Sequence, residues 1–208
     1  NEMGGSGIYA QIICPAIMLV TFAAATLITK SSWMGAFAAL SLMALLGFMA
    51  SVIPFGYAVG FKGDGALARA TSIAILMVGG FVVFHALKVS NPYITAFETG
   101  TLVGGGFVGY LGLLIASAKW YTERQNWFIM QIIVLGICFA GVMTGSIFAL
   151  KSIQVMAGVF LALWTIEKMV EIPGHGFVPY LLKGMGASGA LYLIVTYATP
   201  LYAAQFIH

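Results

Sequence analysis

Long apolar runs separated by short polar connections dominate the hydrophobic pattern of this chain. Seven runs are long enough, or nearly so, to cross a hydrocarbon core of about 30 Å as a helix. They are continuous and lack the short apolar/polar alternation of a transmembrane β-strand, so helices are predicted. The sixth run is one of the two shortest, and without it six helices would cross the membrane. The runs cover residues 8–29, 33–59, 70–87, 94–118, 127–150, 153–170 and 178–206.

Three of the connections are short and resemble one another. Lys30, Lys88 and Lys151 each end an apolar run, and each is followed within two residues by serine. The other three connections are longer and more polar. This pattern indicates three helix hairpins and a final helix, with repeat units 8–68, 69–126 and 127–177 before residues 178–206. The alternative is that any short hairpin at a membrane surface looks like this, without internal duplication.

The composition supports a membrane protein. The 208 residues are 61% hydrophobic and 7% charged, whereas a soluble domain carries roughly 25% charged residues. The net charge of +3 comes from single residues and not from a basic run, so we expect no nucleic-acid partner. The sequence thus predicts an all-α bundle of about seven transmembrane helices, residues 1–208 forming one domain in a lipid bilayer.

The distribution of lysine and arginine predicts an orientation. The side with the longer connections holds six of these residues and the side with the short turns holds three. Because positive residues favour the cytoplasmic side, the longer connections are predicted to be cytoplasmic, in an inner or plasma membrane. The N-terminus is then inside, and with seven helices the C-terminus is outside. Trp33, Trp120, Tyr121 and Trp127 lie at the ends of runs, as interfacial aromatic anchors do.

His85 and Glu98 are the main candidates for chemistry. They lie at similar distances before and after the short turn at Lys88, so antiparallel helices would place them at a common depth, roughly 9–10 Å inward at 1.5 Å per residue. An imidazole and a carboxylate facing each other there could bind a solute or relay a proton. The alternative is that His85 reaches the interface and Glu98 stabilises the start of its helix.

Uncharged polar residues and glycines form a second group of candidates. Gln11, Gln131 and Thr144 could line a pathway, although such side chains more often form hydrogen bonds between helices. Small residues four positions apart allow helix backbones to approach closely. We expect close packing at Gly56 and Gly60 as well as at the glycines of the fourth and fifth runs, which are Gly100, Gly104, Gly105, Gly109, Gly141 and Gly145.

An enzyme is not expected. Gly186-Ala187-Ser188-Gly189 resembles the nucleophile motif of rhomboid intramembrane proteases over four residues. A rhomboid has its histidine two helices after the serine, where this chain has only part of one helix. The ionisable residues within the runs also lack the spacing of metal ligands, so no metal or cofactor is expected.

Two functions remain open from the sequence. The first is a channel or transporter for a small solute or ion, with a polar site near His85 and Glu98. The second is a non-catalytic subunit that packs against other membrane subunits, or against copies of itself, in a larger complex. Sparse charges, short connections and 11 methionines favour the second function, since methionine adapts well to contact surfaces.

Overall fold

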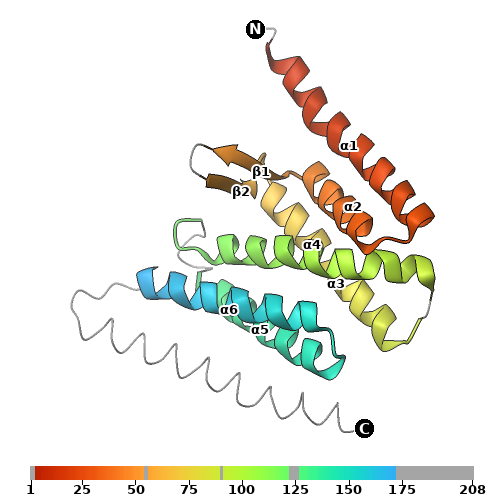
Figure 1. The fold of residues 1–208 in the computed structure, drawn as a ribbon. Helices are drawn as coiled ribbons and strands as arrows, with labels where there is room; N and C mark the ends of the chain where they lie inside the picture. Colours follow the sequence, from red (N-terminus) through yellow and green to blue (C-terminus); the bar gives the residue numbers. More distant parts are fainter. Residues whose placement is uncertain (1–2, 54–55, 90, 122–126, 172–208) are drawn as a thin grey trace. The chain divides into compact units, whose positions relative to one another are not determined.

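The computed structural model describes residues 3–53, 56–89, 91–121 and 127–171, without the side chains of residues 3–11, 51–53, 56 and 57. Six helices and one pair of strands are found in this part of the chain (Figure 1). The whole chain divides into two compact units, Asn1–Gly112 and Leu113–His208, called here the N-terminal and the C-terminal unit. The elements are α1 (Met3–Thr29), α2 (Ser32–Leu45), β1 (Phe48–Ile53), β2 (Gly56–Phe61), α3 (Ala66–Ala86), α4 (Pro92–Ser117), α5 (Trp127–Ile147) and α6 (Lys151–Glu171).

The prediction of a helical fold is confirmed and its long apolar helices are compatible with a membrane bundle, but the predicted count of about seven membrane helices is not matched. Among the described residues, five helices are long and apolar enough to cross a membrane: α1, α3, α4, α5 and α6. The sixth apolar run, one of the two shortest, is one of them. Pro15 lies inside α1. The seventh run, with Lys183, Pro200 and the rhomboid-like residues, lies outside the described part.

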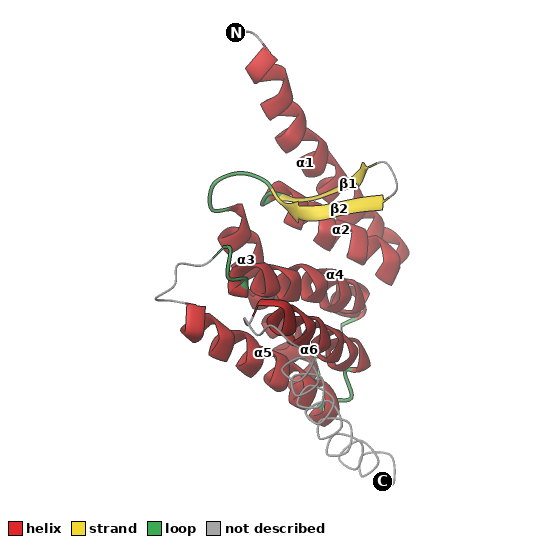
Figure 2. Cartoon of the chain, turned by 90° about the vertical axis from the view of Figure 1, so that its left-hand side faces the viewer, coloured by secondary structure: helices red, strands yellow, loops and turns green. Residues whose placement is uncertain are grey.

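The second apolar run does not form one helix. Its helix α2 has 14 residues, which at 1.5 Å per residue is about 21 Å. Gly47 ends it with a φ of +100°, a conformation that glycine adopts without steric cost. The chain then forms an antiparallel hairpin in which Phe48 pairs with Phe61 and Ile53 with Gly56 (Figure 2).

The residues of the hairpin explain why it is not helical. Val52, Ile53 and Val59 are β-branched and favour strands, while Pro54 cannot donate a helical hydrogen bond. The expectation of helix packing at Gly56 and Gly60 was therefore wrong, because both residues lie in β2.

Glycines on two faces of α4 bring its backbone close to α2 and α3. On one face, Gly100 leaves no room for a Cβ atom beside Ala36, and Gly104 lies against Leu40. On the other face, a Cβ atom at Gly105 or Gly109 would lie 3.4–3.8 Å from atoms of α3. A cluster of buried side chains joins these helices to the hairpin, formed by Met43, Phe48, Ala70, Ala74 and Val108. The N-terminal unit is thus built around α4.

Lys30 and Lys88 adopt the same left-handed backbone conformation, whereas in the turn before Lys151 another residue adopts it. Lys30 and Lys88 have φ values of 53° and 52°. After α3, the amides of Lys88 and Val89 donate to the carbonyls of His85 and Phe84, which is a Schellman ending. In the third turn the residue with positive φ is Ala149, at 56°. The repeated pattern of lysine followed by serine therefore corresponds to a common turn conformation in two of its three copies.

The left-handed conformation of Lys88 leads to a stability prediction. A residue with a Cβ atom there carries a steric cost of about 1 kcal/mol that glycine avoids. We expect Lys88→Gly to be more stable than Lys88→Ala by about that amount, because both variants lose the same exposed charge and only one keeps the strain. Thermal unfolding of the two variants in detergent measures the difference, and equal midpoints would contradict it.

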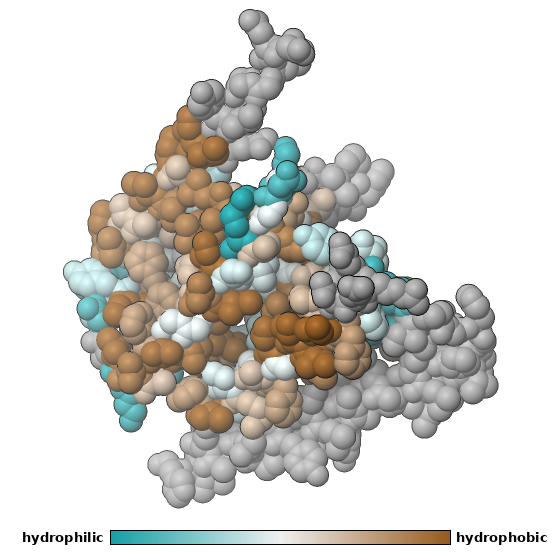
Figure 3. Space-filling view, turned by 180° about the vertical axis from the view of Figure 1, so that it is seen from behind, coloured by the Kyte–Doolittle hydropathy of each residue, from teal (hydrophilic) through white to brown (hydrophobic). Residues whose placement is uncertain are grey.

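On the face shown in Figure 3, the described residues are mostly apolar, with hydrophilic residues in small patches. On α1, large exposed side chains are found on several sides of the helix, at Ile12, Ile13, Ile17, Met18, Val20, Leu27 and Ile28. In water such a surface would drive aggregation, whereas in a bilayer it contacts lipid. Trp33, Trp120 and Tyr121 are also exposed, as interfacial anchors would be.

Candidate functional site

The structure places His85 and Glu98 in direct contact within the N-terminal unit. Nδ1 of His85 lies 2.8 Å from Oε1 of Glu98. The Lys88 turn ends α3, and Asn91 begins α4 by accepting the amide hydrogen of Tyr93 on its side-chain oxygen at 2.9 Å. Pro92 follows as the first helical residue, a position that suits proline. This tight connection brings the last turn of α3 beside the second turn of α4, which is the geometry that the sequence predicted.

The surroundings of the two side chains differ. The His85 side chain is 40% exposed, while that of Glu98 is 18% exposed. His85 lies in the last turn of α3, where the helix dipole favours a positive charge. No acidic residue lies in the first turn of α4, so Glu98 does not act there as an N-terminal helix stabiliser. The carboxylate instead has the imidazole as its partner.

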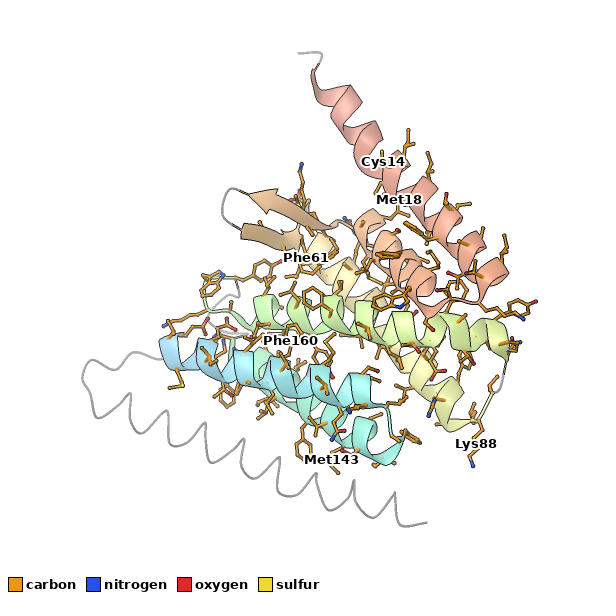
Figure 4. All side chains as sticks on the ribbon, in the orientation of Figure 1. Cys14, Met18, Phe61, Lys88, Met143 and Phe160 are labelled. Atoms are coloured by element: carbon orange, nitrogen blue, oxygen red, sulfur yellow. The ribbon has the colours of Figure 1, made fainter. Side chains whose placement is uncertain are left out.

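Positive side chains lie near the same turn. Lys30 extends over the ring of Tyr93, with its Nζ atom 5.5 Å from the ring centre. Lys88 is exposed, and its side chain points away from the helices (Figure 4). This end of the N-terminal unit therefore combines one carboxylate, one imidazole and two ammonium groups.

Gln131 lies in the C-terminal unit and joins three helices. Its Nε2 atom donates to the carbonyl oxygen of Ser117 at 2.8 Å and to that of Trp127 at 3.2 Å. Its Oε1 atom accepts a hydrogen bond from Nε1 of Trp164 at 2.9 Å. The side chain is buried and uses both ends of its amide. These contacts match the packing interpretation of Gln131 and leave little capacity for binding a solute.

Lys168 is a second ionisable group beside this network. Its Nζ atom donates to the carbonyl oxygen of Ser117 at 2.9 Å and contacts Glu171 Oε2. The carbonyls in the last turn of α4 lack partners within their own helix, so a cation satisfies them well. Nζ also lies 5.8 Å from the centre of the Trp127 ring. Trp127 is thus a partner of Lys168, which corrects its interpretation as a simple interfacial anchor.

The cluster of Glu167, Lys168 and Glu171 was not predicted from the sequence. Lys168 was counted only among the lysine and arginine residues that predict the membrane orientation, and Glu171 was assigned to the connection after the sixth apolar run. The signal was present, because three ionisable residues within five positions stand out in an otherwise apolar run. Spacings of three and four residues also place Glu171 on the same helix face as both others.

The remaining candidates with described side chains take part in neither the His85–Glu98 pair nor the cluster of Glu167, Lys168 and Glu171. Gln11 lies in the part of α1 whose side chains are not described, and Thr144 is half-buried near the end of α5. Ser146, which follows Thr144 by two residues in α5, is buried and accepts a hydrogen bond from Gln154 at 3.2 Å. Gly141 is buried, and Gly145 lets α5 approach the backbone of Gln154 in α6. Gly145 therefore serves close packing of α5 and α6.

In the described part of the chain, no three His, Cys, Asp or Glu residues lie close enough to hold a metal ion. Cys14 and Cys138 are free thiols, the first exposed and the second buried. Phe160 is a buried residue of α6 (Figure 4). No protein-family model, no curated protein and no solved structure matches this chain.

Proposed function

We propose that this multi-pass membrane protein passes a small solute or ion across the bilayer, with His85 and Glu98 as its polar site. The observation that carries the proposal is the 2.8 Å contact between these side chains at adjoining ends of two apolar helices. Ionisable residues inside membrane helices are costly, so they tend to serve a function. The pair joins helices that the glycines of α4 already pack closely, so packing alone does not require it.

A proton is the solute that best suits this pair. Imidazole changes its charge near neutral pH, and its two nitrogens can receive a proton on one side and release it on the other. Because Nδ1 contacts Glu98 and the ring is 40% exposed, Nε2 is the nitrogen available to the surroundings. A proton taken up at Nε2 allows the Nδ1 proton to pass to the more buried carboxylate. The same carboxylate could bind a small cation instead.

The orientation forms part of this proposal. Six lysine and arginine residues on the side of the longer connections against three on the other support a cytoplasmic location for the longer connections, in an inner or plasma membrane. This arrangement requires α2 and the hairpin together to cross the membrane. The N-terminus is then cytoplasmic, and the short turns, including that at Lys88, face outward. With a seventh helix after α6 the C-terminus would also face outward. His85 would then exchange protons with the outer side.

Flux measurements in proteoliposomes test the proposal. The protein is reconstituted with a trapped pH-sensitive dye, and valinomycin with a potassium gradient sets the membrane potential. We expect wild-type vesicles to take up protons, and His85→Ala and Glu98→Gln vesicles to fall to the rate of protein-free liposomes. Glu98→Asp should keep part of the flux, since it retains the carboxylate. The same vesicles are then assayed for sodium, a small monocarboxylate and urea.

A matched control separates loss of the pair from general damage. Thr21 is exposed on α1 and donates its hydroxyl to the carbonyl of Ile17 in its own helix, so Thr21→Val should leave the flux unchanged. Wild-type flux in both His85→Ala and Glu98→Gln would contradict the role of the pair. A folded wild-type protein that passes none of the four solutes would contradict passage itself.

The alternative function is that of a non-catalytic subunit in a larger membrane complex. The two-stranded hairpin favours it, because Met49 and Val59 are exposed on its strands and backbone groups outside helices need partners in a membrane. In that case the protein should purify from its native membrane in mild detergent with fixed partners or as a homo-oligomer. A monomer with solute flux would favour the first function.

A further inference from the structure

The end of α6 holds a buried centre with unequal charges. Lys168 supplies one positive charge, and Glu167 and Glu171 supply two carboxylates. Their side chains are 8%, 14% and 4% exposed, respectively. Lys168 Nζ contacts Oε2 of Glu171 and lies 3.7 Å from Oε1 of Glu167. If all three were ionised, the centre would carry a net charge of −1 out of contact with water, which is far more costly than burial of a neutral group.

The two carboxylates have very different partners. Glu171 has Lys168 at one oxygen, and its Oε1 atom accepts the backbone amide hydrogen of Lys119 at 2.7 Å. Neither oxygen of Glu167 has a hydrogen-bond partner within the described residues, although each exposes less than 1 Å². Burial disfavours the ionised form of Glu167 most, while the charge of Lys168 attracts this carboxylate and the charge of Glu171 repels it. The uncompensated charge therefore falls on Glu167.

The elements around the centre supply no second cation among the described residues. From α5 come Trp127 and Gln131, both neutral, and the end of α4 contributes the carbonyl of Ser117. Lys119 reaches Glu171 through its backbone amide, while its own side chain is exposed. A bound metal ion near Glu167 would lie close to the Lys168 ammonium and be repelled. A proton needs no ligand shell and neutralises the carboxylate directly.

We propose that Glu167 binds a proton at neutral pH and that this centre is a proton-exchange site, with Lys168 and Glu171 as its fixed ion pair. When the proton leaves, the repulsion between the two carboxylates increases. Glu171 then holds the Lys119 amide less firmly, and this hydrogen bond ties the end of α6 to the residues after α4. Protonation at Glu167 thus controls how tightly the two helix ends are joined. The site is independent of His85 and Glu98.

Infrared spectroscopy of the full chain in lipid bilayers detects the proton directly. A protonated carboxylic acid has a carbonyl stretch that is separate from the amide bands and shifts in D₂O. We expect this band at neutral pH in the wild type and its loss in Glu167→Gln. Glu171→Gln should lose it as well, because Lys168 alone then balances the charge of Glu167. Glu98→Gln should keep the band, which separates this test from the proposed transport.

Three results would overturn the proposal. The first is the absence of a protonated carboxyl band in the wild type at neutral pH. The second is a band that survives Glu167→Gln or Glu171→Gln. The third is a band that sodium chloride removes and choline chloride does not, since a metal ion would then supply the charge. Circular dichroism checks the folding of each variant, and the two glutamine variants test the proposal separately if one of them does not fold.

Discussion

Gly100→Ala is expected to lower the free energy of unfolding by about 3 kcal/mol, at the upper end of the range for overpacked sites. The new Cβ atom would lie 2.6 Å from the Cα atom of Ala36 and equally close to the carbonyl carbon of Gly35. These are backbone atoms, so no side-chain rotation can make room and α2 must move away from α4. Gly35 meets the backbone of Ala96 in the same crossing, where a Cβ atom would lie 2.5 Å from its carbonyl oxygen.

Gly106→Ala is the matched control for this prediction. Gly106 lies on the same helix, and a Cβ atom there has no neighbour within 4 Å in the described structure. Alanine favours helix over glycine by about 1 kcal/mol, so this variant should be as stable as the wild type or slightly more stable. Unfolding of both variants in detergent, followed by circular dichroism, gives the comparison. Similar losses in both would contradict the close crossing of α2 and α4.

The close crossing at α4 could be predicted from local spacing alone. Pairs of glycines four residues apart fix a face of a helix before any partner is known, and the structure places α2 and α3 against such faces. The contact between His85 and Glu98 was predictable for a related reason. A tight turn at Lys88 leaves antiparallel helices as neighbours, so counting residues away from the turn fixes the depth of each side chain.

The hairpin could not be recognised with the same ease, because a continuous apolar run fits a buried helix and a buried strand equally well. The β-branched residues around Pro54 and Gly47 before it were the better signals. They decide the outcome because strand pairing satisfies the backbone on both sides of the proline.

The centre at Lys168 is formed by residues of three helices that lie far apart in the sequence. Ser117, Gln131 and Lys168 belong to different helices. The short turn between α5 and α6 relates the depths of Gln131 and Lys168, but a longer connection separates Ser117 from α5. Gln131 was a candidate for a pathway, with packing between helices as the alternative, and its hydrogen bonds fit the alternative. The ionisable residues near Gln131 were taken to lie at the water-facing end of a helix, since a lysine near an interface usually extends to water. Here the ammonium instead satisfies a carbonyl at the end of α4.

Lys168→Met is expected to destabilise the protein by about 3–5 kcal/mol, as the removal of one partner from a buried ion pair usually does. Methionine fills a similar volume but cannot donate to the carbonyl of Ser117 or balance Glu171. Two buried carboxylates would then share one site without a cation. Adding Glu171→Gln to this variant should recover part of the loss, because coupled neighbours are not additive.

Lys119→Met supplies the comparison that assigns this loss to the buried ammonium. Lys119 contacts Glu171 only through its backbone amide among the described contacts, and its side chain is exposed. Its replacement should change the stability by no more than about 0.5 kcal/mol. Unfolding in detergent at neutral pH measures all four proteins. If Lys168→Met proved as mild as Lys119→Met, the ammonium would lie in water and the buried charge imbalance around Glu167 would not exist.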